Sequence, residues 1–391
     1  MTTDIDYSSH NEEVRQVWDA YWKGAPIRVP VGSFTIGPRI WVLDPRLNTD
    51  GITWERFSTD PDVMFDTVLK YKHHLHHHVV HDIEMGVPEA GWDIGVEFAN
   101  IYEAAWLGCD ILYPTGQISA TRPRYAGDCG NEIFEEGLPD PASGLMGRVW
   151  EYYEHFVKRA RNFAFHGKPV KVGPPGPLIG TDGPLTVALD IRGDEIFSDM
   201  LADPDYYHRL MDFITTATIR RITAWRTRLG LPERPACGGF ADDAIQMIST
   251  GTYQELVLPY HRRLLSALFG SGPHWMHICG NVQRHFPTLI RELNIGSFDT
   301  GFPIRFETLR DEIGEAIHVS GGMHVDILLR GTPADVARET RRILASGVTR
   351  GGRFIMKEAN NMPPCTPLEN IRAMYETVRQ HGTFPAGSCP A

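Results

Sequence analysis

The sequence has no long apolar run, few cysteines and no excess of positive charge, and each absence excludes a class of protein. No segment approaches the roughly 18 uncharged apolar residues that a membrane-spanning helix needs, and the mean hydropathy is −0.25. The 38 Lys and Arg stand against 49 Asp and Glu, so the net charge is −11 and the surface repels phosphate backbones. We therefore expect neither membrane insertion nor nucleic-acid binding.

Cysteine is sparse, with 6 residues in 391 and no short-spaced framework. The first residues, MTTDIDYSSHNEEV, lack the basic and apolar regions of a secretory signal. Thiols in such a chain are free or bind metal more often than they pair as disulfides. We expect a cytoplasmic protein that acts on a small molecule.

The sequence does have a strand–helix rhythm from about residue 149 onward. Short apolar runs, at 168–173, 235–240, 274–279, 295–299, 316–320 and 353–357, alternate with amphipathic segments such as 203–229 and 332–344. This alternation is typical of a parallel sheet, and its length favours an α/β fold of the (β/α)8 TIM type. We expect residues 1–146 to form a helical N-terminal extension with loops, packed on a barrel of residues 147–391 within one structural domain.

The segment His277-Ile-Cys279-Gly-Asn281 carries the strongest chemical signal, because it ends one of these apolar runs. Residues i and i+2 of a strand point to the same face, so His277 and Cys279 can approach one point. Imidazole and thiolate are preferred zinc ligands. A buried cysteine beside a barrel-interior histidine is the alternative interpretation.

The last predicted strand also ends in polar residues, Glu358, Asn360 and Asn361, followed by Cys365. The two amides are candidates for binding a polar substrate or for capping the next helix. Cys365 is the third metal ligand that we favour on chemical grounds, and Glu358 is the alternative that position favours.

Two acidic residues and a group of histidines complete the candidates. Asp242 and Asp243 follow the 235–240 run and are candidate catalytic groups, although capping of the next helix explains one of them. Six histidines crowd one predicted helix and its end: His73, His74, His76, His77, His78 and His81. We expect this cluster to serve packing or the rim of the site without a catalytic metal.

Several motifs resemble the uroporphyrinogen decarboxylase superfamily, clearly over residues 147–381. They are Tyr253-Gln-Glu-Leu-Val-Leu-Pro-Tyr260, His277-Ile-Cys-Gly-Asn281, Gly331-Thr-Pro333 and Pro364-Cys-Thr-Pro-Leu-Glu-Asn370, joined by Gly183-Pro-Leu-Thr-Val-Ala188 and Arg28-Val-Pro-Val31. The resemblance is nearest to the zinc-dependent methylcobalamin:coenzyme M methyltransferase branch. It implies a distorted (β/α)8 barrel, in agreement with the strand–helix pattern.

The resemblance also implies an activity: transfer of a methyl group from a corrinoid, or a similar donor, to a thiol held by Zn²⁺. No Asp-x-His-x-x-Gly motif for corrinoid binding occurs in the chain, so a partner protein would supply that cofactor. It carries over His277 and Cys279 as metal ligands, Asp242, Asp243 and Asn360 as catalytic candidates, and Asn281, Asn360, Asn361 and Arg39 as substrate-binding residues. A homodimer is left open.

Two departures from the family pattern bear on this activity. The segment that is arginine-rich in true decarboxylases is Thr35-Ile-Gly-Pro-Arg39 here, with a single arginine. Asn360 stands where the methyltransferase branch has its third zinc ligand, a cysteine, which is why Cys365 and Glu358 are considered. The alternative function is a metal-independent decarboxylase or carbon–carbon lyase acting on a small carboxylated substrate.

Overall fold

Five parallel strands form the largest sheet of the computed structural model, which describes residues 6–32 and 34–384. They are β6 (Gly239–Ala241), β7 (His274–Ile278), β8 (Ile295–Thr300), β9 (His318–Met323) and β10 (Phe354–Glu358), in the order β10-β9-β8-β7-β6. All four pairings are parallel. Each predicted apolar run from residue 235 onward therefore leads into a strand, although the exact bounds differ by a few residues.

The other strands extend this series at both edges. Val31 makes a parallel bridge to Met356 of β10, and Asp182 makes one to Ala241 of β6. A second sheet pairs β1 (Trp92–Ile94) in parallel with β5 (Lys168–Val172), and β4 (Ala164–Phe165) joins β5 as a hairpin. β2 (Ile111–Leu112) and β3 (Ala120–Thr121) form a separate antiparallel pair. The segment at Val31, β1, β5 and β6 to β10 supply the strands of a (β/α)8 TIM-type barrel, as the sequence predicted.

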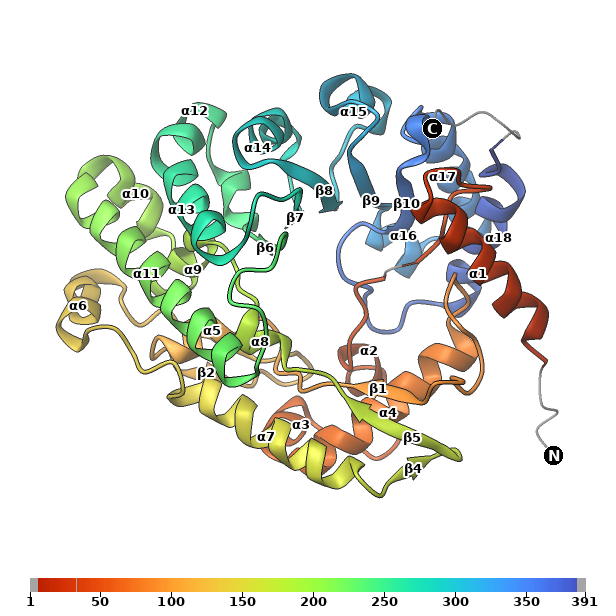
Figure 1. Cartoon of the computed structure of the whole chain (residues 1–391), viewed down its shortest axis with the longest axis horizontal. Helices are drawn as coiled ribbons and strands as arrows, with labels where there is room; N and C mark the ends of the chain where they lie inside the picture. Colours follow the sequence, from red (N-terminus) through yellow and green to blue (C-terminus); the bar gives the residue numbers. More distant parts are fainter. Residues whose placement is uncertain (1–5, 33, 385–391) are drawn as a thin grey trace.

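Helices follow most strands and cover the outer face of the sheet (Figure 1). Those of the first part are α1 (Ser8–Trp22), α2 (Arg39–Val42), α3 (Trp54–Thr59), α4 (Pro61–His78), α5 (Tyr102–Trp106), η1 (Gly127–Asn131), α6 (Glu132–Glu136) and α7 (Gly144–Ala160). The next are α8 (Gly176–Ile179), α9 (Pro184–Arg192), α10 (Glu195–Ala202), α11 (Pro204–Arg228), η2 (Asp243–Met247), α12 (Thr250–Thr252), η3 (Tyr253–Val257) and α13 (Leu258–Leu268). The last are η4 (Gln283–His285), α14 (Phe286–Leu293), α15 (Phe306–Ile313), α16 (Val325–Arg330), α17 (Pro333–Ala345), η5 (Arg350–Gly352) and α18 (Leu368–His381).

Helix starts follow local chemistry closely. Thr332 caps α17 through its side chain and forms a capping box with Asp335, while Pro333 occupies the first helical position. The side chain of Asp203 caps α11 by accepting from the backbone N–H of Tyr206, and Pro204 occupies the first helical position. None of the helices in residues 6–32 and 34–384 combines the length and the hydropathy of a membrane-spanning segment.

The N-terminal part contributes strands as well as helices. β1 pairs with β5, and the segment at Val31 pairs with β10, so strands from both sides of residue 147 take part in the same pairings. The same part is anchored by a buried ion pair, in which both terminal nitrogens of Arg28 donate to the carboxylate of Asp82 at 2.6 and 2.7 Å.

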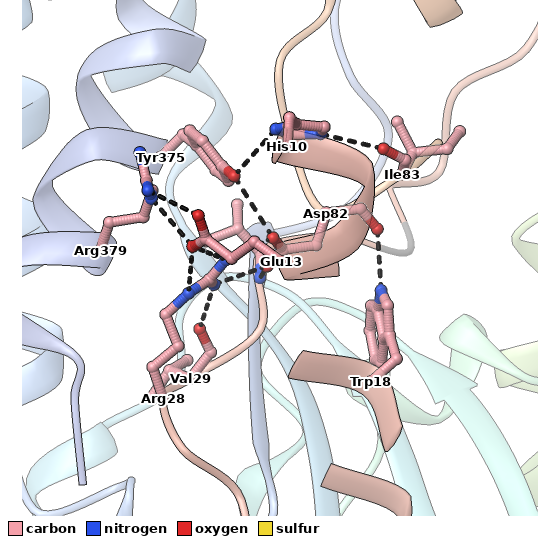
Figure 2. Close-up of polar contacts among 10 residues, drawn as sticks. His10, Glu13, Trp18, Arg28, Val29, Asp82, Ile83, Tyr375 and Arg379 are labelled. Atoms are coloured by element: carbon pink, nitrogen blue, oxygen red, sulfur yellow. Dashed lines mark hydrogen bonds and ion pairs between the residues drawn. The ribbon is translucent and has the colours of Figure 1, made fainter. Parts of the chain in front are cut away.

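Further polar contacts join this ion pair to both ends of the chain. Glu13 of α1 accepts from Arg28 at 3.1 Å and from Arg379 of α18 at 2.6 Å (Figure 2). The indole N–H of Trp18 donates to the carbonyl of Asp82 at 2.8 Å. The network thereby fixes α1 and α18 against the first strand of the barrel.

Candidate metal centre

Three potential metal ligands converge at the carboxyl ends of β6 and β7. The ligand atoms of Asp243, His277 and Cys279 all lie within 4.8 Å of one another, and among the described residues they are the one group of this kind. His277 and Cys279 share a face of β7 and its extension, as period-2 alternation predicted. Asp243 begins η2 directly after the neighbouring strand, and its Oδ1 accepts from the backbone N–H of Cys279 at 2.7 Å.

Asp299 of β8 orients the imidazole of His277. Its Oδ2 lies 2.9 Å from Nδ1 of His277, in the register that pairs these two residues across the strands. Burial lowers the pKa of His277, but the hydrogen bond and charge of Asp299 outweigh it, so the pKa is raised. With Nδ1 held by a carboxylate, Nε2 is the nitrogen left for a metal, an arrangement common in metalloproteins.

Lys357 of β10 supports Asp299 from the other side. Its ammonium donates to Oδ1 of Asp299 at 3.0 Å and to the hydroxyl of Thr35 at 2.7 Å, and the side chain is almost completely buried. Burial raises the pKa of Asp299, but the hydrogen bond from His277 and the charge of Lys357 lower it by more, so the pKa falls below its usual value. Asp299 is thus a carboxylate that a buried cation and an imidazole hold in place.

The three converging residues fit a divalent metal by their chemistry. A histidine nitrogen, a cysteine sulfur and a carboxylate oxygen are all established zinc ligands, and three protein ligands are the number that catalytic zinc sites use. Burial, together with the neighbouring carboxylate of Asp243, raises the pKa of the Cys279 thiol when no cation is present. A bound cation would reverse this, because a coordinating thiol loses its proton.

The asparagines after β10 lie next to this group. Gly301 lies between Cys279 and Ala359, the residue before Asn360. A Cβ added to Gly301 would come 3.1 Å from Cβ of Cys279 and would clash with the carbonyl of Ala359. Asn361 donates from Nδ2 to Oδ1 of Asn360 at 3.1 Å. Both asparagines are half-buried, and their role in substrate binding stays a prediction.

The structure does not bring Cys365 to this group. Cys365 is exposed, has a left-handed backbone (φ 64°), and lines a small cavity with Asp44, His74 and Ile36. Burial of its sulfur and the charge of Asp44 raise the pKa of this thiol. The Pro363-Pro364 turn lies between the end of β10 and Cys365, and the third residue of the converging group is Asp243.

Glu358, the other candidate ligand from the sequence, is also outside the group. Its side chain is fully buried, with Oε1 accepting from the backbone N–H of Thr35 at 2.6 Å. Oε2 is buried without a hydrogen-bond partner. Burial raises the pKa of this carboxyl from 4.5 to about 8, although the nearby charge of Lys357 opposes the shift.

This raised pKa predicts a pH-dependent stability. Because the folded protein holds the Glu358 proton more tightly than the unfolded chain, the contribution is fully present below pH 4.5 and is lost as the pH rises to about 8. Glu358→Gln, which keeps the shape without the titration, should flatten the dependence of the unfolding free energy on pH between these values. Urea unfolding at several pH values measures it, and equal slopes in both proteins would contradict the assignment.

Asp242, the other predicted catalytic aspartate, is turned into the protein. Its carboxylate accepts from the backbone N–H of Thr186 at 2.9 Å, from the hydroxyl of Thr186 at 2.7 Å, and from Nε2 of His261 at 2.7 Å. It is fully buried and holds the first turn of α9 against β6. Of the two adjacent aspartates, only Asp243 belongs to the converging group. The predicted capping of the next helix is not found for Asp242, because its side chain makes no cap at η2 and instead binds the start of the earlier helix α9.

The remaining sequence candidates do not belong to the converging group. Arg39 begins α2 and is half-buried, and Asn281 is exposed just beyond Cys279.

The histidines of α4 pack against one another and against β1. The rings of His73 and His77 stack at 4.0 Å, His73 stacks on His166 at 4.4 Å, and Trp92 lies beside them. Burial lowers the pKa of His73 and of His74 to about 4.

Sequence reasoning did not identify Asp299 and Lys357 as parts of the site. Both follow apolar residues within predicted strands, and polar residues at the carboxyl ends of barrel strands are the usual signal of function. The strands at 295–299 and 353–357 were predicted, so a search for their terminal polar residues would have found them.

Removing the support of His277 gives a further prediction. Asp299→Asn keeps the size of the side chain but removes its charge, so we expect metal affinity to fall by roughly 10- to 100-fold, the usual effect of losing such an outer partner. Competition with a chromophoric chelator measures the affinity. Asp311→Asn, on the exposed face of α15, is the matched control, and equal affinity in both variants would show that Asp299 does not orient the ligand.

Comparison with known proteins agrees with this architecture. A solved structure described as a methyltransferase from Methanosarcina mazei superposes with a TM-score of 0.63 at 18% identity, covering 94% of this chain and 98% of that chain. At such low identity the likeness establishes the fold. The protein is thus a (β/α)8 barrel that gathers potential metal ligands at the carboxyl ends of its strands.

The family follows from the sequence comparison. Residues 101–381 match the model of the family described as uroporphyrinogen decarboxylase (URO-D), and the chain belongs to this family. A methylated-thiol–coenzyme M methyltransferase of Methanosarcina mazei is 30% identical over 50% of this chain and 51% of its own length. A uroporphyrinogen decarboxylase of Syntrophotalea carbinolica is 30% identical over 52% and 60%. The matches thus span only about half to three fifths of these relatives.

Proposed function

We propose that this chain is a zinc-dependent methyltransferase that moves a methyl group from a corrinoid, or a similar donor, to a thiol. The observation that carries the proposal is the convergence of Asp243, His277 and Cys279, with Asp299 behind the imidazole. Relatives described as a methylated-thiol–coenzyme M methyltransferase and a methylcobamide:CoM methyltransferase support the same chemistry. The donor would be carried by a separate corrinoid protein, as the absence of a corrinoid-binding motif from the sequence implies.

Asp243, His277 and Cys279 would hold the metal. When bound, zinc supplies a Lewis-acid position at which a thiol loses its proton at neutral pH. Asp299 keeps the proton of His277 on Nδ1, so that Nε2 presents its lone pair to the centre. Lys357 keeps Asp299 charged and fixed, and therefore holds the imidazole in one orientation.

The amides of Asn360 and Asn361 would bind and orient the polar part of the substrate at the mouth of the barrel. Their mutual hydrogen bond leaves the oxygen of Asn361 and the nitrogen of Asn360 for a ligand. In the proposed reaction the thiolate sulfur of the substrate would take the methyl group, and the donor would leave with the electron pair of the broken bond. Asn360→Ala should weaken substrate binding and leave metal content unchanged.

Metal analysis of protein purified without a polyhistidine tag, combined with an assay of methyl transfer from methylcobalamin to small thiols, tests the proposal. We expect near-stoichiometric zinc and a transfer rate that falls when a chelator removes it. The second candidate is a metal-independent decarboxylase or lyase, which the 30% identity to a uroporphyrinogen decarboxylase favours. Protein without metal that decarboxylates a small carboxylated substrate would establish this second function.

A further inference from the structure

The side chain of Trp275 lies on the inner face of the barrel, below the metal group. Trp275 and His277 share one face of β7, while Met276 and Ile278 between and beyond them are completely buried on the other. This second face points outward, toward the helices. Phe240 of β6, which pairs with Met276, packs against His261 of α13. The indole is nevertheless 48% exposed, which is unusual for a large apolar side chain inside a barrel.

Small residues surround this indole. Trp275 pairs with Gly239 on one side and with Ser297 on the other, and the next layer holds Ala241 and Ser320 on either side of His277 and Asp299. Barrel interiors are normally filled by bulky branched side chains. A Cβ added to Gly239 would come 2.5 Å from Cδ2 of Trp275, so the indole lies over this glycine and depends on its bare backbone.

We propose that Trp275 is an apolar binding shelf for the tail of the substrate, which deepens the proposed function and rests on it. The shelf lies two residues, or roughly 6.6 Å along the strand, from His277. A thiol whose sulfur lies at the metal group would place a chain of a few carbon atoms, or an aromatic ring, on the indole. The substrate class is therefore a small thiol with an alkyl or aromatic tail.

The charges on this face favour the same class. The residues that pair with Trp275, Gly239 and Ser297, are uncharged, and the other basic side chains on the inner face besides His277 are His318, Lys357 and Arg353 at the start of β10. Lys357 is engaged by Asp299 and Thr35, and His318 is engaged by Tyr21 at 2.8 Å and by Arg353. Burial and the charge of Arg353 lower the pKa of His318 to about 4, so it is neutral at pH 7. The cations Lys357 and Arg353 thus lie at β10, whereas a tail that extends from His277 along β7 meets the indole between uncharged neighbours.

The test compares two thiols that differ in the tail, 2-phenylethanethiol and 2-mercaptoethanol, by isothermal titration calorimetry on the purified protein. In Trp275→Ala we expect affinity for 2-phenylethanethiol to fall about tenfold, the scale of a lost aromatic contact with its buried area. Affinity for 2-mercaptoethanol and the metal content should not change. Trp22→Ala removes an indole that is 67% exposed on α1 and is the matched control.

A second variant keeps the indole and fills the space beside it. Ser297→Leu should weaken 2-phenylethanethiol binding to a similar extent, and it decides the question if Trp275→Ala does not fold. Equal affinity for the two thiols in the natural protein, or natural affinity for 2-phenylethanethiol in the folded variants, would overturn the proposal.

The shelf and the proposed function can fail separately. Binding of 2-phenylethanol to chelator-treated protein needs no metal, and we expect it to depend on Trp275 in the same way. If this dependence holds in protein that binds no zinc and transfers no methyl group, the shelf stands and the methyltransferase assignment falls. If zinc and methyl transfer are found while 2-phenylethanol binds Trp275→Ala as tightly as the natural protein, the proposed shelf is wrong and the methyltransferase assignment stands.

Discussion

Asp243→Asn, His277→Ala and Cys279→Ser are each expected to remove most of the bound metal and to abolish methyl transfer. Each variant removes one of three converging ligands, and two protein ligands do not hold zinc tightly in sites of this kind. The affinity should fall by more than about 100-fold, beyond the loss typical of outer-shell partners. Metal content by mass spectrometry, with the transfer rate measured on the same samples, gives the result.

Cys365→Ser is the matched control for this experiment, because it removes a thiol that lies outside the group, next to Asp44. Its metal content should equal that of the natural protein. The double variant His76→Gln/His78→Gln, in the cluster on α4, should also retain the metal. If Cys365→Ser loses the metal and Asp243→Asn keeps it, Cys365 is the third ligand, as the sequence favoured. Metal lost from the histidine double variant would move the site to α4.

Asp82→Ala is expected to cost about 3–5 kcal/mol of unfolding free energy, the usual effect of removing one partner of a buried ion pair. Arg28 is 4% exposed and would keep its hydrogen bonds to Glu13 and the carbonyl of Val29 and its place over the ring of Tyr375. The backbone N–H of Val31 would also lose its acceptor, Oδ2 of Asp82, which lies 2.6 Å away. Urea unfolding followed by circular dichroism measures the loss.

The comparison variant is Glu12→Ala, which breaks a fully exposed pair with Arg15 on the same helix, α1. Exposed pairs of this kind contribute little, so its stability should match that of the natural protein. If the two variants are equally stable, the network in Figure 2 does not anchor the first strand.

Local patterns in the sequence predicted most of the elements that place the site. Apolar runs gave the strands, because a strand buried under helices needs apolar side chains over a short length. Thr332-Pro333 gave the start of α17, because the capping box depends on neighbouring residues alone. The common face of His277 and Cys279 also followed, because alternation in a strand is a property of one segment.

Contacts between segments required the tertiary structure. Asp242 and Asp243 are adjacent and chemically identical, and only the turn after β6 decides that one holds α9 while the other faces the metal group. The distance from Cys365 to His277 depends on the path of the Pro363-Pro364 turn, which sequence spacing does not determine. Strand register set the pairing of His277 with Asp299 and of Trp275 with Gly239, because it depends on how separate strands align in the barrel.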